Sequence, residues 1–168
     1  GIGTYVKASS ENNFMLGDRA NDDLRVDAID LKAKVLVEGG NVGVTQLARI
    51  EYAQNGGLIY TDAIDNSAGV DCSDHEVNVK ILLADAIESG DLKQEDRNAL
   101  LATMKDDIAK LVLSNNYHQT QAIDNMLSSA PDVLYMQLRL VRELEREGFL
   151  DRQLEFLPSD KDIKARFV

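Results

Sequence analysis

The sequence predicts an α/β fold in the N-terminal half of the chain and an all-helical fold in the C-terminal half. Two observations lead to this division. In residues 1–75, short apolar runs bounded by glycines alternate with stretches that have the apolar spacing of helices. In residues 76–168, apolar residues recur three and four positions apart almost throughout. Alternation of strands and helices is typical of a parallel sheet with crossover helices, so we expect a partial Rossmann-like sheet followed by helices.

Three strands and two helices are expected in the N-terminal half. The predicted strands are residues 1–6, 33–38 and 58–61, of which the second should be buried. The predicted helices are residues 18–26 and a segment from Thr45 to Asn55, which Gly56-Gly57 ends. Ligands of a parallel sheet bind beyond the carboxyl ends of its strands, so the segments that follow the three strands should converge at one edge. These segments are residues 1–4, 38–41 and 62–73.

A polar loop is predicted over residues 62–72, ahead of a helix that begins near Ser73. Ser73 and Glu76 have the S-x-x-E spacing of a capping box, and an apolar run follows them. Backbone N–H groups at such a helix start can meet an anion or the polar edge of a ligand. Four acids disfavour a phosphate there but tolerate a neutral or cationic group. They are Asp62, Asp65, Asp71 and Asp74. A capped helix after a tight turn explains the same residues without any ligand.

The C-terminal half reads as successive helices. The spacing of leucine, methionine and isoleucine predicts helices over residues 92–113, 116–127 and 131–147. Pro131 suits the first turn of the last of these, and Gly148 ends it. After Pro158, Ser159-Asp160 can cap a final short helix. These apolar stripes are interpreted as core residues and not as cofactor contacts.

The composition narrows the functions. The chain has 168 residues, 44% of them hydrophobic, and a net charge of −11. It can therefore form a packed core, but it lacks the positive charge of a protein that binds nucleic acid or an anionic membrane. No apolar run has transmembrane length, and one cysteine, Cys72, excludes an internal disulfide. We expect a cytoplasmic location and, because the chain opens on Gly1-Ile2-Gly3 without a methionine, a fragment of a longer polypeptide.

Two sharper alternatives find little support. Several metal-ligand residue types occur together, but neighbouring residues on a capped helix point in different directions, so no metal site is predicted. They are Asp71, Cys72, Asp74, His75 and Glu76, with His118 far away in the sequence. The sequence also has no G-x-G-x-x-G between a strand and a helix, so the pyrophosphate grip of a dinucleotide site is not in these residues.

Residues 61–78, TDAIDNSAGVDCSDHEVN, resemble the large bacterial NAD-specific glutamate dehydrogenases. Within them, residues 66–76 are similar to the N-A-G-G-V-x-x-S-x-x-E stretch of glutamate dehydrogenases in general. Residues 38–45, EGGNVGVT, resemble the family's E-G-A-N-x-P-T-T. The opening GIGTYVKAS and the segment GDRAND look like the large bacterial class too. The departures exchange one small residue for another: Ser67 for alanine, Ala68 for glycine, Gly40 for alanine and Gly43 for proline.

The resemblance implies roles for the matched residues. Asn66, Asn41 and Gly40 would lie on the nicotinamide side of NAD, and Ser73 would hold the side-chain carboxylate of glutamate in a pocket lined by Val70. Residues 1–75 would be the distal part of the NAD-binding domain, and residues 76–168 a helical region. The family's catalytic lysine and aspartate have no matched position here, so the fragment alone should be inactive.

The resemblance further implies L-glutamate and 2-oxoglutarate as substrates, the remainder of a parent chain as partner, and a homo-oligomer. Two alternatives stay open. The chain could be a non-catalytic module that makes contacts between domains or subunits. It could also belong to a dehydrogenase of another amino acid, although a serine at position 73 mildly favours a carboxylate-bearing side chain.

Overall fold

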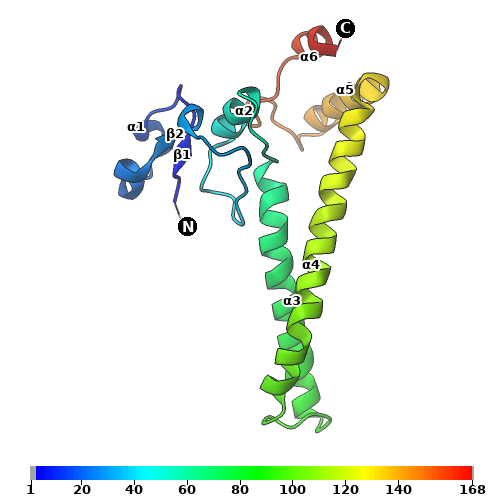
Figure 1. Cartoon of the computed structure of the whole chain (residues 1–168). Coiled ribbons are helices and arrows are strands. Elements are labelled where there is room, and N and C mark those ends of the chain that lie inside the picture. Colours follow the sequence, from blue (N-terminus) through cyan, green and yellow to red (C-terminus); the bar gives the residue numbers. More distant parts are fainter. Residues whose placement is uncertain (1–2, 168) are drawn as a thin grey trace.

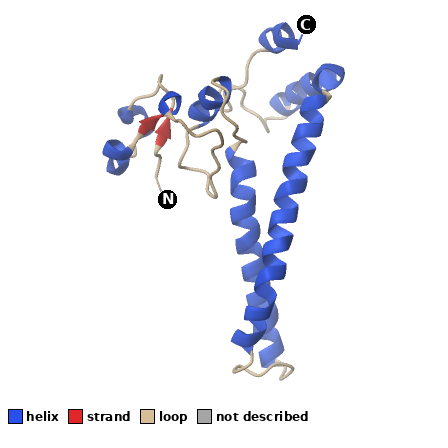
Figure 2. Cartoon of the chain, in the orientation of Figure 1, coloured by secondary structure: helices blue, strands red, loops and turns tan. Residues whose placement is uncertain are grey.

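The computed structural model describes residues 3–167, and the side chains of residues 3–165. A small N-terminal region lies beside α2, and two long helices form an antiparallel hairpin that projects from it (Figures 1 and 2). The elements are β1 (Val6–Lys7), α1 (Asn13–Leu16), η1 (Arg19–Leu24), β2 (Val26–Asp27), η2 (Ala28–Asp30), α2 (Gln46–Gln54), α3 (Asp62–Glu88), α4 (Arg97–Ser128), α5 (Ala130–Arg146) and α6 (Asp160–Phe167). The predicted helical C-terminal half is therefore observed, with few and short strands before it.

Every strand pairing in the described part of the chain is parallel. β1 pairs with β2 through Val6 and Val26, and Val6 also forms a single parallel bridge with Val44. A second single bridge joins Val35 to Leu58. The parallel sheet is thus present as two strands and isolated bridges. The predicted strands over residues 33–38 and 58–61 shrink to one bridge.

The prediction that residues 33–38 are buried is wrong. Val35 is 56% exposed and Val37 is 72% exposed, and of the apolar side chains between residues 34 and 38 only Leu36 packs against the core. Only the backbone is satisfied: the Leu58 N–H donates to the Lys34 carbonyl at 2.9 Å, and the Leu36 N–H donates to the Leu58 carbonyl at 3.0 Å. A buried parallel strand needs a covering layer on each face. Residues 33–38 have the apolar pattern of a buried strand, but Val35 and Val37 are left exposed on one face.

The core of the N-terminal region gathers around α2. It consists of Val6, Ala28, Val44, Ala48 and Tyr52. The Tyr52 hydroxyl donates to the Ala33 carbonyl at 2.7 Å, so the buried ring also has a polar partner. α2 begins as predicted: the Thr45 side chain accepts from the Ala48 N–H at 3.1 Å. It ends before Gly56, whose φ of 87° lies in the left-handed region.

The predicted loop over residues 62–72 is wrong, and so is the helix start at Ser73. α3 is one continuous helix through this stretch, and residue 75 lies near its middle. Asp62 and Asp65 lie in its first turn, where negative charge is favoured by the helix dipole, and no proline interrupts the stretch. The Ser73 hydroxyl donates back to the Gly69 carbonyl at 3.4 Å, as serines do in the interior of a helix. The S-x-x-E pattern therefore does not act as a cap here.

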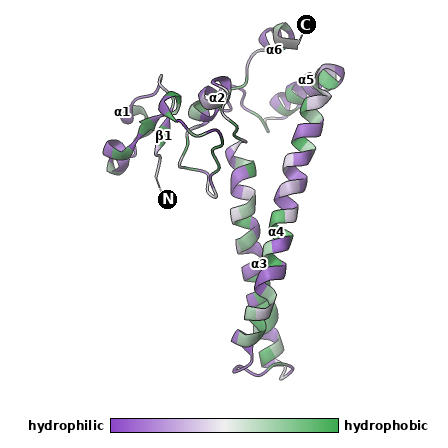
Figure 3. Ribbon diagram, viewed as in Figure 1, coloured by the Kyte–Doolittle hydropathy of each residue, from purple (hydrophilic) through white to green (hydrophobic). Residues whose placement is uncertain are grey.

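α3 and α4 pack along their lengths as a hairpin. Polar contacts join the two helices near its open end: Ser67 to Gln119, Asp71 to Asn115, and the Asn116 amide to the Ile64 carbonyl. Leu83 and Val112 are buried within the hairpin. Apolar and polar residues otherwise alternate along both helices (Figure 3). The two helices predicted over 92–113 and 116–127 are one helix, since nothing between them breaks the pattern.

The C-terminal elements follow their predicted boundaries. Pro131 lies in the first turn of α5, and Gly148, with φ of 76°, follows its end. The Ser159 hydroxyl accepts from the Asp162 N–H at 3.2 Å, so it caps α6. In the described part of the chain, no helix combines the length and the apolar character that crossing a bilayer requires.

Candidate functional site: a loop docked on a helix

The segment that leads into β1 and the segment before α2 lie next to each other. The Thr4 hydroxyl donates to the Val42 carbonyl at 3.0 Å, and the Tyr5 and Val6 N–H groups both donate to the Gly43 carbonyl. Thr4 of the first expected segment therefore contacts Val42, which directly follows the second segment, but it does so before β1 and not beyond the carboxyl end of a strand. Residues 1 and 2 of the first segment lie outside the described residues.

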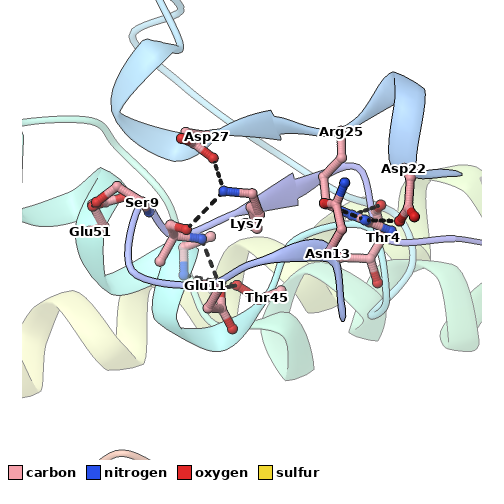
Figure 4. A network of polar contacts seen from close by, with 12 residues as sticks. Thr4, Lys7, Ser9, Glu11, Asn13, Asp22, Arg25, Asp27, Thr45 and Glu51 are labelled. Atoms are coloured by element: carbon pink, nitrogen blue, oxygen red, sulfur yellow. Dashed lines mark hydrogen bonds and ion pairs between the residues drawn. The ribbon is translucent and has the colours of Figure 1, made fainter. Parts of the chain in front are cut away.

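Arg25 fixes Thr4 in this position. Its guanidinium is fully buried and donates to the Thr4 carbonyl at 2.9 Å, to Asn13 and to Asp22 (Figure 4). Asp18 accepts from the Thr4 N–H at 2.8 Å. This backbone N–H, with the Asn21 amide and the nearby Arg25 charge, holds the pKa of the Asp18 carboxyl below its usual value. The backbone of Thr4 is thus held at both its N–H, by Asp18, and its carbonyl, by Arg25.

Residues 38–43, which we call the Glu38 loop, close around a single carboxylate. Glu38 Oε1 accepts from the Val42 N–H at 3.1 Å and from the Gly43 N–H at 2.7 Å. A Cβ added at Gly43 would lie 3.0 Å from that oxygen, and one added at Gly40 would lie 3.2 Å from it. The small residues therefore let the backbone fold tightly over the carboxylate. Asn41 lies at the exposed side of this loop.

One buried arginine ties the Glu38 loop to α2 and α3. Arg49 of α2 is 3% exposed, and its Nη2 lies 2.9 Å from Glu38 Oε2 while its Nη1 lies 2.8 Å from Asp65 Oδ2. The same Nη1 donates to the Tyr60 carbonyl at 2.8 Å, and the Glu38 N–H donates to Asp65 at 3.3 Å. Two carboxylates share one guanidinium, so the formal charge of the cluster is negative. That charge disfavours a phosphate beside it.

The Glu38 loop touches α3 at a glycine. A Cβ added at Gly69 would lie 2.3 Å from the Gly39 carbonyl oxygen, a distance that no side chain can occupy. The third segment expected to converge is thus in backbone contact with the second. Asn66 lies three residues before Gly69 on the same face of the helix and is partly exposed. The two asparagines singled out from sequence therefore come from adjoining segments.

Residues 1–126 match a family model described as the catalytic domain of bacterial NAD-glutamate dehydrogenase. The chain belongs to this family. It is 54% identical over 166 residues to an NAD-specific glutamate dehydrogenase of Pseudomonas aeruginosa, 49% identical to that of Halomonas elongata and 48% identical to that of Mycobacterium tuberculosis. Each comparison covers 99% of the chain and 10% of the relative. The chain thus spans about a tenth of the length of these dehydrogenases.

The two residues that the family resemblance assigns to glutamate lie farther along α3. Ser73 is exposed one turn beyond Gly69, and its hydroxyl bonds within the helix. Val70 is 45% exposed and lines a cavity of about 450 Å³ between α3 and α4, with Asp74 and His118 among the other lining residues. Asn66 therefore lies one turn from Gly69, where α3 meets the Glu38 loop, whereas Val70 faces the α4 side of the helix.

The sequence reasoning missed the ion cluster of the site. Arg49 lies four residues after Thr45 and three before the buried Tyr52, on the buried side of α2, and a charge at such a position signals a buried ion pair. Glu38 was assigned no role, and Asp65 was read as part of a loop. Among the described residues, no group of three or more His, Cys, Asp and Glu side chains lies close enough to hold a metal ion.

Proposed function

We propose that this chain is part of an NAD-dependent glutamate dehydrogenase that oxidatively deaminates L-glutamate to 2-oxoglutarate and ammonia. The observation that carries the proposal is the docking of the Glu38 loop on α3 at Gly69 in a member of this family. This contact places the two segments that resemble the family's nicotinamide-side and substrate motifs side by side. The relatives are named NAD-specific glutamate dehydrogenase, which supports NAD as the cofactor.

The cofactor roles fit the chemistry of the residues present. Asn41 and Asn66 each offer an amide with donor and acceptor atoms, which matches the carboxamide and ribose hydroxyls of the nicotinamide half. Gly40 lets the loop backbone close over the Glu38 carboxylate, because a Cβ there would lie 3.2 Å from Oε1. The negative Glu38–Arg49–Asp65 cluster suits the nicotinamide side of NAD better than its phosphates. Accepting a hydride is the chemistry that NAD supplies when bound.

The substrate roles are proposed for Ser73 and Val70. An exposed hydroxyl at Ser73 can donate to the side-chain carboxylate of glutamate once it leaves its weak 3.4 Å bond to the Gly69 carbonyl. Val70 would supply an apolar wall beside it. The internal bond of Ser73 favours the alternative reading, in which this stretch is a structural helix of a non-catalytic module. A dehydrogenase of another amino acid is the remaining alternative.

The wider organisation also belongs to this proposal. Residues 1–75 would be the distal part of a Rossmann-like NAD-binding domain, and residues 76–168 a helical region, although α3 crosses the proposed boundary. The remainder of the parent chain would supply the catalytic lysine and aspartate. A homo-oligomer in the cytoplasm completes the expectation, and the exposed apolar side chains of the hairpin, such as Ile81 and Leu113, support partners on its surface.

Steady-state kinetics of a full-length dehydrogenase that carries this segment test the proposal. Asn66→Ala should raise KM for NAD, and Ser73→Ala should raise KM for glutamate or lower kcat/KM, each by about ten-fold or more. Asn98→Ala and Ser114→Ala, exposed on α4, are the matched controls and should behave as wild type. Normal kinetics in both test variants would establish the structural reading instead.

A further inference from the structure

We infer that Arg49 is a positioning residue that sets the placement of the Glu38 loop on α3, and so of Asn41 relative to Asn66. The inference rests on the proposed function and adds to it a residue that no family motif named in the sequence includes. Arg49 itself is buried and offers nothing to a ligand directly. Its effect on the site passes through the two carboxylates that it holds.

Each carboxylate is connected to one half of the site. Glu38 uses one oxygen for Arg49 and the other for the Val42 and Gly43 N–H groups, which close the loop around Asn41. Asp65 accepts from Arg49 and immediately precedes Asn66 in α3. A continuous series of hydrogen bonds therefore runs from the Val42 N–H, beside Asn41, through Glu38 and Arg49 to Asp65, the residue that precedes Asn66 in the chain.

The shape of the arginine suits this role better than charge alone does. A guanidinium presents its N–H donors in a rigid planar fork, so holding two carboxylates at once also fixes the angle between them. The side chains are 3% exposed for Arg49, 5% for Asp65 and 17% for Glu38, so water does not compete strongly for these bonds. A lysine would keep the positive charge but would lose the fork and the reach to both partners.

The burial also argues against a purely stabilising role. Arg49 Nε is buried without a hydrogen-bond partner in the described part of the chain. A buried ion cluster with an unsatisfied donor is a poor source of stability, because desolvation opposes the Coulomb attraction. What the arrangement does fix is geometry. The same residues hold the Glu38 loop against α3, at the position where Gly69 allows the two backbones to touch.

The test is Arg49→Lys in a full-length dehydrogenase that carries this segment. We expect KM for NAD to rise about ten-fold or more while KM for glutamate stays within about two-fold, because the Glu38 loop moves and α3 does not. If Arg49 only stabilised the fold, a smaller fraction of the enzyme would be folded and active. The apparent kcat would then fall, and both KM values would stay unchanged. Arg152→Lys is the matched control: Arg152 also joins two carboxylates, Glu145 and Asp160, at the other end of the chain.

A second variant covers the case in which a lone buried charge prevents folding. The triple change Glu38→Gln, Arg49→Met and Asp65→Asn removes all three charges together, which avoids leaving any of them unpaired. We expect this variant to fold and still to show the raised KM for NAD. Wild-type KM for NAD in the triple variant, or an equal loss of kcat with unchanged KM values in Arg49→Lys, would overturn the inference.

A distance measurement separates this inference from the proposed function. Spin labels at Val37→Cys and Val70→Cys in a Cys72→Ser background, on exposed sites before the loop and on α3, report their separation in this chain without any activity. The triple variant, which leaves no buried charge unpaired, should broaden the distance distribution. A sharp, unchanged distribution would refute the positioning role. Broadening in a parent whose Asn66→Ala kinetics are normal would refute the proposed function and leave the positioning role intact.

Discussion

Gly69 is the residue at which two segments far apart in the sequence come closest. The Gly39 carbonyl oxygen occupies the space that a side chain at position 69 would need, 2.3 Å from the ideal Cβ. Glycine in a helix interior normally destabilises the helix by about 0.5–1 kcal/mol relative to alanine. Its presence within α3 is therefore explained by the contact with the Gly39 carbonyl and not by helix propensity.

Gly69→Ala should reverse the usual order of helix propensity. The added methyl group has to push away a backbone carbonyl, so we expect loss of about 1–3 kcal/mol of unfolding free energy, as for other overpacked sites. Urea denaturation of this chain measures it. Ser73→Ala, on the same face one turn away and without such a clash, is the control. A Gly69→Ala variant that is more stable than wild type would contradict the close approach.

The same contact shows what sequence reasoning at this scale could reach. The family motifs could be recognised in the sequence, and they contain Asn41, Asn66 and Ser73. Arg49 and Gly69 act through partners 11 to 30 residues away, which local spacing does not reveal. A charge in the buried stripe of α2 was the one available signal for Arg49. Its two partners could not be named without the fold.

At the scale of elements, signals that act within one turn were reliable. Thr45, Gly56, Gly148 and Ser159 mark helix ends where the sequence predicted them, because each satisfies or releases backbone groups next to itself. The failures involved context. Residues 33–38 carry a strand pattern but leave Val35 and Val37 exposed, and residues 62–72 look like a loop but lie in a helix held against α4 and the Glu38 loop.

A pair of alanine variants tests the corrected start of α3. Thr45→Ala is the reference: it removes the N-cap of α2 and should lower the unfolding free energy by about 0.5–2 kcal/mol. Ser73→Ala replaces an interior helical residue by a better helix former and should change it by less than about 0.5 kcal/mol. Thermal or urea unfolding of both variants gives the comparison. A loss near 1 kcal/mol in Ser73→Ala would restore Ser73 as a helix cap.

At the scale of the whole molecule, the chain is two unequal parts. The N-terminal region has its own core around Tyr52, and the α3–α4 hairpin extends away from it (Figure 1). Two helices alone bury little, and Val77, Ile81, Leu82 and Leu111 of the hairpin remain between 52% and 64% exposed. Surfaces of this kind normally contact other segments or subunits. The proposed cofactor and substrate residues lie where the hairpin joins the N-terminal region.

This arrangement predicts that the isolated chain does not oxidise glutamate. The proposed contacts to NAD and glutamate only position these molecules, and the lysine and aspartate that would polarise and deprotonate the amino group would come from the remainder of the parent. Without these residues the reaction loses the rate enhancement of about 10²–10⁴ that a positioned proton acceptor contributes. It also loses the proximity of the reacting groups that a closed site provides. The measurement is glutamate-dependent formation of NADH by the purified chain, with the full-length dehydrogenase at equal molarity as the positive control. Turnover by the chain alone would show that it contains its own acid–base residues, and the division of labour proposed here between this segment and the rest of the enzyme would have to be abandoned.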